Sequence, residues 1–140
     1  MQQIWSCYLE QKAIKYGCSN KGRGVPSWSG AIMYSEHFFD ENIAAVITSL
    51  IGNIDNEALD ANGNTVRYQG RPNLKAYANL VRDTASQIGC AWNRCGENYT
   101  MFCLTNQPLL RNNQGVYSVA SKVCECPSGK KCAPWEGLCF

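Results

Sequence analysis

The sequence predicts one domain of the α/β or α+β class with a cysteine-rich tail. Three stretches carry apolar residues at helical spacing, and two short apolar runs after them are typical of a β-hairpin. The 140 residues are enough for one compact core. Helices mixed with a few strands belong to the α/β or α+β classes.

The first two predicted helices lie before residue 55. Residues 5–16 place Trp5, Leu9, Ala13 and Tyr16 at helical spacing, and residues 19–29 are polar with Gly and Pro, which indicates a loop. Asp40 is a suitable N-cap for the second helix. Its apolar face consists of Ile43, Val46, Ile47, Leu50, Ile51 and Ile54.

Residues 55–70 are polar with an Asn-Gly turn signal, so we expect a long exposed loop there. Pro72 then opens a third helix, because its missing N–H is not needed at a helix start. One side of this helix carries Leu74, Tyr77, Ala78, Val81, Ala85 and Ile88. The tail is small, polar and rich in cysteine, so we divide the chain into a domain at 1–116 and a tail at 117–140.

The predicted hairpin has strands at 88–92 and 99–104 around a turn at Gly96-Glu97. Cys95 and Cys103 flank this turn, and we expect a disulfide between them.

The nine cysteines favour disulfides in an oxidising, secreted setting. They are Cys7, Cys18, Cys90, Cys95, Cys103, Cys124, Cys126, Cys132 and Cys139. A zinc site is the alternative, but their spacings are irregular and the only histidine, His37, is distant in sequence. Asn98 begins an Asn-Tyr-Thr glycosylation sequon, which agrees with secretion. The odd cysteine count leaves room for a free thiol or an intermolecular bridge.

Charge and hydropathy exclude two broad classes of partner. The net charge is only +2 and Lys and Arg form no run, so nucleic-acid binding has no electrostatic support. No apolar stretch approaches the roughly 20 residues of a membrane-spanning helix, so we expect no membrane insertion.

Four segments together resemble the CAP superfamily of cysteine-rich secretory, antigen 5 and pathogenesis-related proteins, in particular its secreted members from parasitic nematodes. The segments are MQQIWSCYLEQKA, QIGCAWNRC, YTMFC, and the ending GVYSV with CECPSGKKC and GLC. The resemblance implies a three-layer α/β/α sandwich with a small antiparallel sheet and a cysteine-rich C-terminal hinge. It also implies a further family helix, with a possible extra cysteine, before the segment at which this chain starts.

The resemblance also implies where a metal-binding or catalytic set of two histidines and two acids would stand. Those four positions are occupied by Tyr16, Ala31, Asn53 and Ala76. Alanine has no ligand atoms and an amide is a poor metal ligand, so we expect no metal, no cofactor and no enzymatic activity. His37 has no partner base at motif spacing, and the loop serines Ser27, Ser29 and Ser35 lack a G-x-S-x-G motif.

A binding function therefore remains. The segment YANLVRDT at 77–84 is similar to a segment of hookworm CAP proteins that block host integrins, which implies a secreted antagonist of platelet aggregation and adhesion, or of leukocyte adhesion. Integrin ligands present a carboxylate to bound Mg²⁺, and no RGD or KGD tripeptide is present. The loop acids that could serve instead are Asp55, Glu57, Asp60 and Glu97.

Three alternatives stay open. Trp135 and Phe140 could anchor a partner or cover a small core in the tail. Family members proposed to bind sterols or fatty acids imply a possible lipid ligand, and a structural or immunogenic secretion is the third possibility. For the remaining cysteines, we expect two bridges among the four of the tail and a bridge from Cys90 to Cys7 or Cys18.

Overall fold

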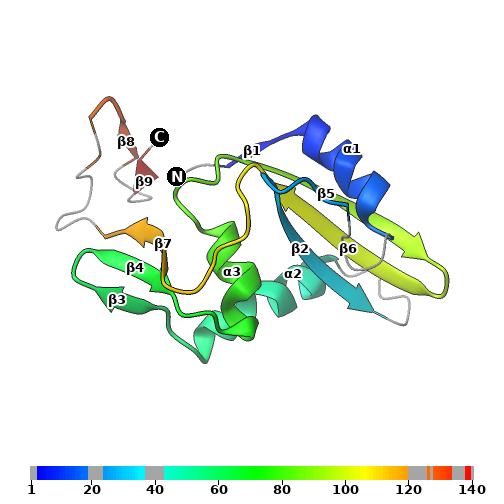
Figure 1. The fold of residues 1–140 in the computed structure, drawn as a ribbon, viewed down its shortest axis with the longest axis horizontal. Helices are drawn as coiled ribbons and strands as arrows, with labels where there is room; N and C mark the ends of the chain where they lie inside the picture. Colours follow the sequence, from blue (N-terminus) through cyan, green and yellow to red (C-terminus); the bar gives the residue numbers. More distant parts are fainter. Residues whose placement is uncertain are drawn as a thin grey trace.

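The computed structural model describes residues 3–18, 24–36, 43–119, 126, 128–133 and 138–139. Its main sheet has the strand order β1-β5-β6-β2, with β1 parallel to β5 and the other pairs antiparallel. The strands are β1 (Ile4–Trp5), β2 (Gly30–Glu36), β5 (Gln87–Cys95) and β6 (Asn98–Thr105) (Figure 1). The predicted hairpin is therefore confirmed, with both strands longer than expected.

Helix α1 (Cys7–Tyr16) covers one face of this sheet and confirms the first predicted helix. The Ser6 side chain accepts a hydrogen bond from the Leu9 backbone N–H at 3.4 Å, which satisfies one donor of the first turn. Leu9 and Ala13 are buried against Phe102 and Leu104 of β6. Alternate residues of a strand point to opposite faces, so this face takes the even-numbered residues of β6 at that point.

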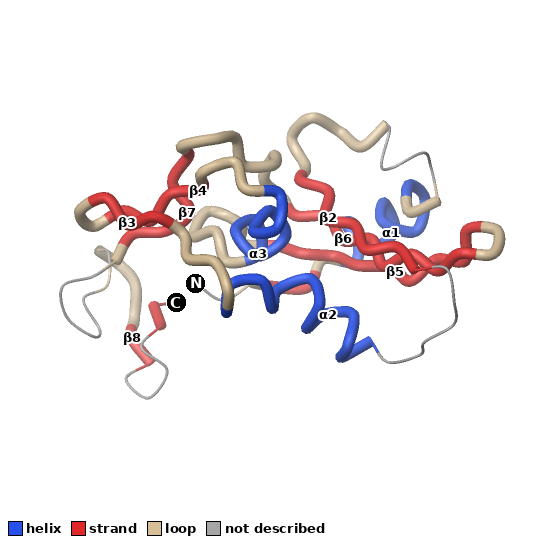
Figure 2. The backbone as a smooth tube through the Cα atoms, turned by 90° about the horizontal axis from the view of Figure 1, so that it is seen from below, coloured by secondary structure: helices blue, strands red, loops and turns tan. Residues whose placement is uncertain are grey.

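The opposite face of the sheet is covered by α2 and α3 (Figures 1 and 2). The elements here are α2 (Ile43–Ile51), the 3-10 helix η2 (Gly52–Asp55), the 3-10 helix η3 (Pro72–Leu74) and α3 (Lys75–Leu80). Helices on both faces of the main sheet give the predicted three-layer α/β/α arrangement. Asp40, the proposed N-cap of the second helix, lies outside the described residues.

The third helix is shorter than predicted: α3 ends at Leu80, whereas the predicted apolar face continues to Ile88. Residues beyond it bond to other segments instead of continuing a helix: the Asp83 N–H donates to the Val116 carbonyl at 2.9 Å. The Asn106 side chain accepts from the N–H groups of Ser86 and Gln87, at 3.1 Å each. Tertiary bonds thus override the helical spacing of Ala85 and Ile88.

The prediction of an exposed loop over 55–70 is wrong. This segment forms β3 (Asp60–Asn62) and β4 (Thr65–Tyr68), which pair antiparallel across a turn where Gly63 has φ of 59°. With β7 (Gln114–Ser118) they make a second sheet, in the order β3-β4-β7. A second core lies beneath it and contains Tyr68, Leu74, Ala78, Leu110 and Val116. Strand β7 crosses the expected domain boundary between residues 116 and 117.

The expected disulfide between Cys95 and Cys103 is also wrong. Cys103 stands opposite Cys90 in the β5–β6 register and is bonded to it, whereas Cys95 stands opposite Asn98. Cys95 is instead bonded to Cys18, which follows α1. Five residues of strand separate Cys103 from the partner position of Cys95, about 16 Å, and a disulfide cannot span that distance.

The expected bridge from Cys90 to Cys7 or Cys18 is therefore wrong as well, and Cys7 is an exposed free cysteine. In the tail, Cys126 and Cys132 are disulfide-bonded. A short pair of strands, β8 (Cys132–Ala133) and β9 (Leu138–Cys139), lies there. His37, Cys124, Trp135 and Phe140 lie outside the described residues.

Candidate functional site

The four positions where the family set was expected are spread over the molecule. Ala31 on β2 packs with the core beneath α1. Tyr16 ends α1, with the Lys15 Nζ 5.5 Å from the centre of its ring. Asn53 is an exposed residue of η2 whose Nδ2 donates to the Asn73 carbonyl at 3.2 Å, and Ala76 lies on α3. Alternation along β2 turns Ala31 away from the face that α2 and α3 cover.

The proposed contact acids fall into two separate regions. Asp55 ends η2, Asp60 begins β3, and Glu57 between them accepts a 2.9 Å hydrogen bond from Asn73 Nδ2. Glu97 is exposed in the turn between β5 and β6, at the opposite end of the molecule from β3 (Figure 1). Asn98, the glycosylation candidate, is partly exposed beside this turn.

Tyr77 lies close enough to Asp55 for the charge of this acid to affect its pKa. Burial raises the pKa of Tyr77 above its ordinary value, and the negative charges of Tyr117 and Asp55 raise this pKa further. In the part of the chain that the structure describes, no three His, Cys, Asp or Glu residues gather as a metal site would require. Ser29 is buried, and its hydroxyl donates to the Thr105 carbonyl at 2.7 Å, which gives it a structural role.

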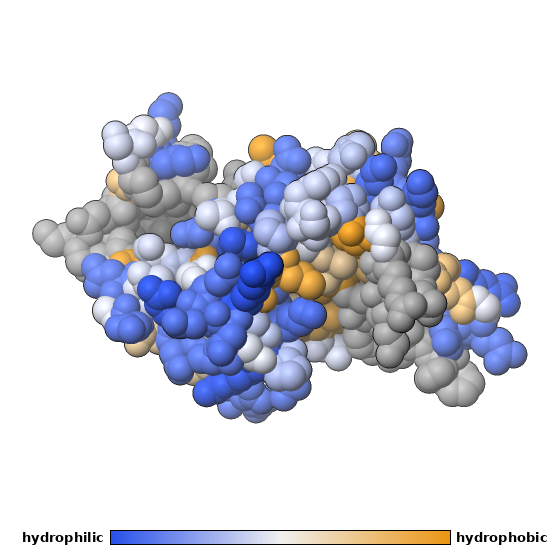
Figure 3. All heavy atoms as spheres, in the orientation of Figure 1, coloured by the Kyte–Doolittle hydropathy of each residue, from blue (hydrophilic) through white to orange (hydrophobic). Residues whose placement is uncertain are grey.

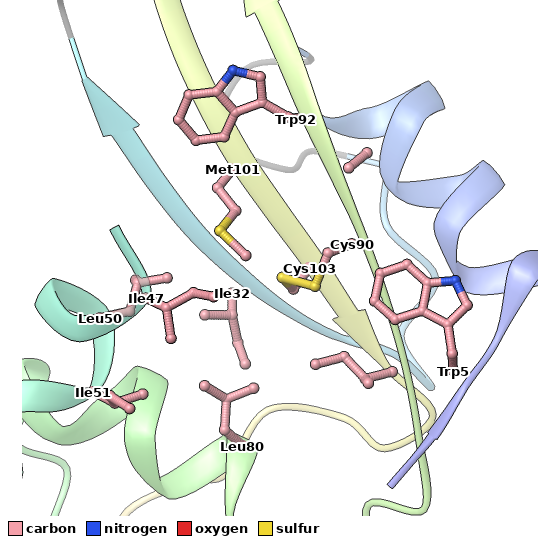
Figure 4. A pocket seen from close by; sticks show the side chains of 12 residues that line it. Trp5, Ile32, Ile47, Leu50, Ile51, Leu80, Cys90, Trp92, Met101 and Cys103 are labelled. Atoms are coloured by element: carbon pink, nitrogen blue, oxygen red, sulfur yellow. A yellow bond between two sulfur atoms is a disulfide. The ribbon is translucent and has the colours of Figure 1, made fainter. Parts of the chain in front are cut away.

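An apolar cavity of about 450 Å³ lies between the main sheet and α2 and α3 (Figure 4). The residues that line it are Trp5, Ile32, Ile47, Leu50, Ile51, Leu80, Ile88, Cys90, Ala91, Trp92, Met101 and Cys103. None of these side chains carries a charge, and their only N–H donors are two indoles. The volume falls within the range of small-molecule sites.

Strand alternation and the Cys90–Cys103 disulfide explain why these side chains meet. Cys90 and Trp92 on β5 and Met101 on β6 point away from α1, toward the cavity (Figure 4). The disulfide lies in the wall and links the two strands directly. Figure 3 shows hydrophobic side chains at the surface in the same central region, where β2, α2 and α3 lie. The cavity therefore has an apolar floor that a disulfide cross-links.

Comparison with known proteins settles the family. The model of the CAP family, described as the cysteine-rich secretory protein family, matches residues 4–106. The chain belongs to the CAP family. A curated CAP relative, the Ancylostoma secreted protein of Ancylostoma caninum, is 26% identical over 151 residues. That alignment covers 96% of this chain and 33% of the relative, so the chain spans about a third of the relative's length.

Solved CAP structures show the same fold. BmVAL-1 matches with a TM-score of 0.73 at 18% identity, over 98% of this chain and 75% of that chain. Hookworm platelet inhibitor matches with a TM-score of 0.64 at 20% identity, over 99% of this chain and 76% of that chain. The resemblance to nematode-type CAP proteins is thus confirmed.

Sequence reasoning did not find the cavity of this CAP chain. The sequence did indicate the side chains that α2 supplies to the cavity, because Ile47, Leu50 and Ile51 lie on the predicted apolar face of that helix. An apolar helical face predicts burial, but no sequence pattern indicates that the facing strands leave a space. None of the four positions expected at a family cleft lines this cavity.

No helix in the described part of the chain has the length and apolar character to cross a membrane.

Proposed function

We propose that this chain is a secreted, non-enzymatic CAP protein of a blood-feeding parasite that antagonises integrins on host platelets, inhibiting their aggregation and adhesion. The supporting observation is its likeness to hookworm platelet inhibitor over 99% of the chain. Blocking leukocyte adhesion is the related alternative. Ala31 and Ala76 offer no ligand atoms for a metal, which supports a binding function over hydrolysis.

The exposed acids are the proposed integrin contacts, since a carboxylate oxygen is the ligand that a receptor-bound Mg²⁺ prefers. Asp55, Asp60 and Glu97 are exposed, whereas Glu57 is partly buried and hydrogen-bonded to Asn73. We therefore rank the three exposed acids ahead of Glu57.

The test measures agonist-induced platelet aggregation and binding to a panel of purified integrins. We expect inhibition by the wild-type protein and at least a tenfold loss in one of the variants Asp55→Asn, Asp60→Asn or Glu97→Gln. The matched control is Glu57→Gln, whose amide oxygen still accepts from Asn73. No inhibition of platelets or of leukocyte adhesion at micromolar concentration would refute the proposal, and stoichiometric zinc in the purified protein would contradict the non-enzymatic part.

A second candidate function is the carriage of an apolar small molecule, of the sterol or fatty-acid class. The apolar cavity favours it, because burial of an uncharged ligand there leaves no charged lining group without a partner. We expect lipid to co-purify with the protein, as detected by mass spectrometry, and a dansyl-labelled fatty acid to bind the delipidated protein.

A substitution that places a charged side chain in the cavity lining tests whether the probe binds there. Ile47 lines the cavity and is 41% exposed, so Ile47→Asp should fold and weaken probe binding at least tenfold. Ile14 is 58% exposed on α1 and lies outside the lining, so Ile14→Asp is the matched control and should bind like the wild type. Equal affinities in the two variants would place the probe elsewhere.

A further inference from the structure

One wall of the cavity differs from the others in how it is held. Trp5 belongs to β1, a strand of two residues at the edge of the main sheet with a single neighbour, β5. Trp5 lines the cavity and yet is 52% exposed as a residue. Figure 4 shows the ring on the side of the Cys90–Cys103 disulfide opposite α2 and α3. Trp5 therefore forms a wall of the cavity that is also in contact with solvent.

The backbone of this wall is held by the pairing of β1 with β5. At the ends of that pairing, the Ile4 N–H donates to the Ser86 carbonyl at 2.9 Å and the Ser6 N–H donates to the Ile88 carbonyl at 2.8 Å. The side chain itself is fixed by one bond, from Trp5 Nε1 to Glu10 Oε2 at 2.9 Å. Glu10 lies on α1, so this bond joins the cavity wall to the helix on the other face of the sheet.

The remaining walls are more firmly built. The floor is formed by the central strands β5 and β6, which are paired along eight residues and cross-linked by the Cys90–Cys103 disulfide. The edge strand β1 is short and exposes the Trp5 side chain, so it buries far less surface than β5 and β6. Elements with little buried surface open first in local fluctuations.

We propose that Trp5 is the movable wall of the cavity, latched by Glu10, through which an apolar ligand enters and leaves. The inference rests on the second candidate function, since it assigns the route to the same cavity. Rotation of the indole away from the cavity breaks one hydrogen bond and leaves the strand backbone in place. The latch stabilises the closed state with and without ligand, so it slows entry and exit together and leaves the affinity nearly unchanged.

Stopped-flow binding of the dansyl-labelled fatty acid tests this. Removing the latch by Glu10→Ala, or by Trp5→Phe, should raise the association and dissociation rate constants together by roughly fivefold, the factor expected for one lost hydrogen bond. The dissociation constant should change less than about twofold, because both rates rise. Glu10→Gln keeps an acceptor oxygen and should behave like the wild type. Trp28→Phe alters another exposed indole, which stacks on Tyr8 outside the cavity, and should change neither rate.

The outcomes separate the latch from the binding function. If the wild-type protein binds no probe, the carriage function fails and the latch with it. If the wild type binds but Glu10→Ala leaves both rate constants unchanged, the latch alone is refuted. A rise in the dissociation rate alone, with a weaker affinity, would make Trp5 an ordinary contact residue instead of a gate.

Discussion

At the residue scale, Gly89 determines how closely α1 approaches the sheet. A Cβ atom at this position would lie 2.6 Å from the Leu9 carbonyl carbon and 2.7 Å from the Leu9 Cβ. Those distances are shorter than van der Waals contact, and the nearest atoms include helix backbone, which cannot move alone. The absence of a side chain here is therefore what allows Leu9 to bury its own against β6.

We predict that Gly89→Ala lowers the free energy of unfolding by about 2 kcal/mol, because the added methyl overpacks the interface between α1 and β5. Chemical denaturation measures this. The matched control is Gly115→Ala on β7, where the nearest atom to a new Cβ is Thr65 Cγ2 at 3.5 Å, and its effect should stay below about 1 kcal/mol. Equal stability of the two variants would contradict the tight packing at Gly89.

Tyr68 gives a prediction for alkaline pH. It is buried in the second core, its hydroxyl donates to the Arg71 carbonyl at 2.9 Å, and burial raises its pKa above the ordinary value of 10.0. The folded protein thus keeps a proton that the unfolded chain releases. The resulting stability is present below pH 10.0 and is lost as the pH rises through the folded-state pKa.

We predict that Tyr68→Phe has a shallower loss of stability above pH 10.0 than the wild type, as measured by denaturation at successive pH values. Val66→Ala, a packing change on the same strand without a titrating group, should retain the wild-type slope. The same slope in the wild type and in Tyr68→Phe would show that Tyr68 does not contribute to the alkaline loss.

At the element scale, the register of β5 against β6 determines how four cysteines pair into two disulfides. Pairing of Cys90 with Cys103 follows from their opposite positions, and Cys95 is then left to reach Cys18 after α1. The second bridge ties the helix layer to the end of the hairpin. A register error of the hairpin would break both connections, so the two bridges and the strand pairing support one another.

Peptide mapping under non-reducing conditions should recover Cys18 linked to Cys95 and Cys90 linked to Cys103. The first bridge closes a span of 77 residues, so Cys18→Ala/Cys95→Ala should lose about 4 kcal/mol of unfolding free energy in the chain-entropy estimate. Cys7→Ala removes an exposed thiol without a bridge and should leave stability unchanged. Recovery of a peptide linking Cys95 to Cys103 would contradict the observed register.

At the scale of the whole molecule, the main sheet separates the core beneath α1 from the cavity, and the second core lies beneath the β3-β4-β7 sheet. A molecule that binds only the folded state stabilises it by mass action. We predict that an apolar ligand at 100 times its dissociation constant raises the unfolding free energy by about 2.7 kcal/mol, visible as a higher melting temperature. A ligand that binds without raising the melting temperature would also bind the unfolded chain, and the cavity would then not be its site.

Local signals in the sequence were sufficient for several elements. The apolar spacing of Leu9 and Ala13 predicted α1, and the runs around Gly96 predicted the β5–β6 hairpin. The motif order predicted the CAP fold, which the family match and the solved structures confirm. The same resemblance implied that Ala31 and Ala76 stand at two positions of the family's metal-binding or catalytic set. That these residues are alanines is read directly from the sequence.

Long-range contacts decided the rest. The strand at 65–68 has only two inward residues, Val66 and Tyr68, among polar neighbours, so its burial depends on pairing with β7 about fifty residues later. Helix α3 stops at Leu80 because the following backbone bonds to Asn106 and Val116, and neither bond has a local signal. The cavity exists because two short helices and the sheet meet without filling the space between them. Sequence periodicity specifies which face of an element is apolar, and only the tertiary structure fixes how completely two such faces close.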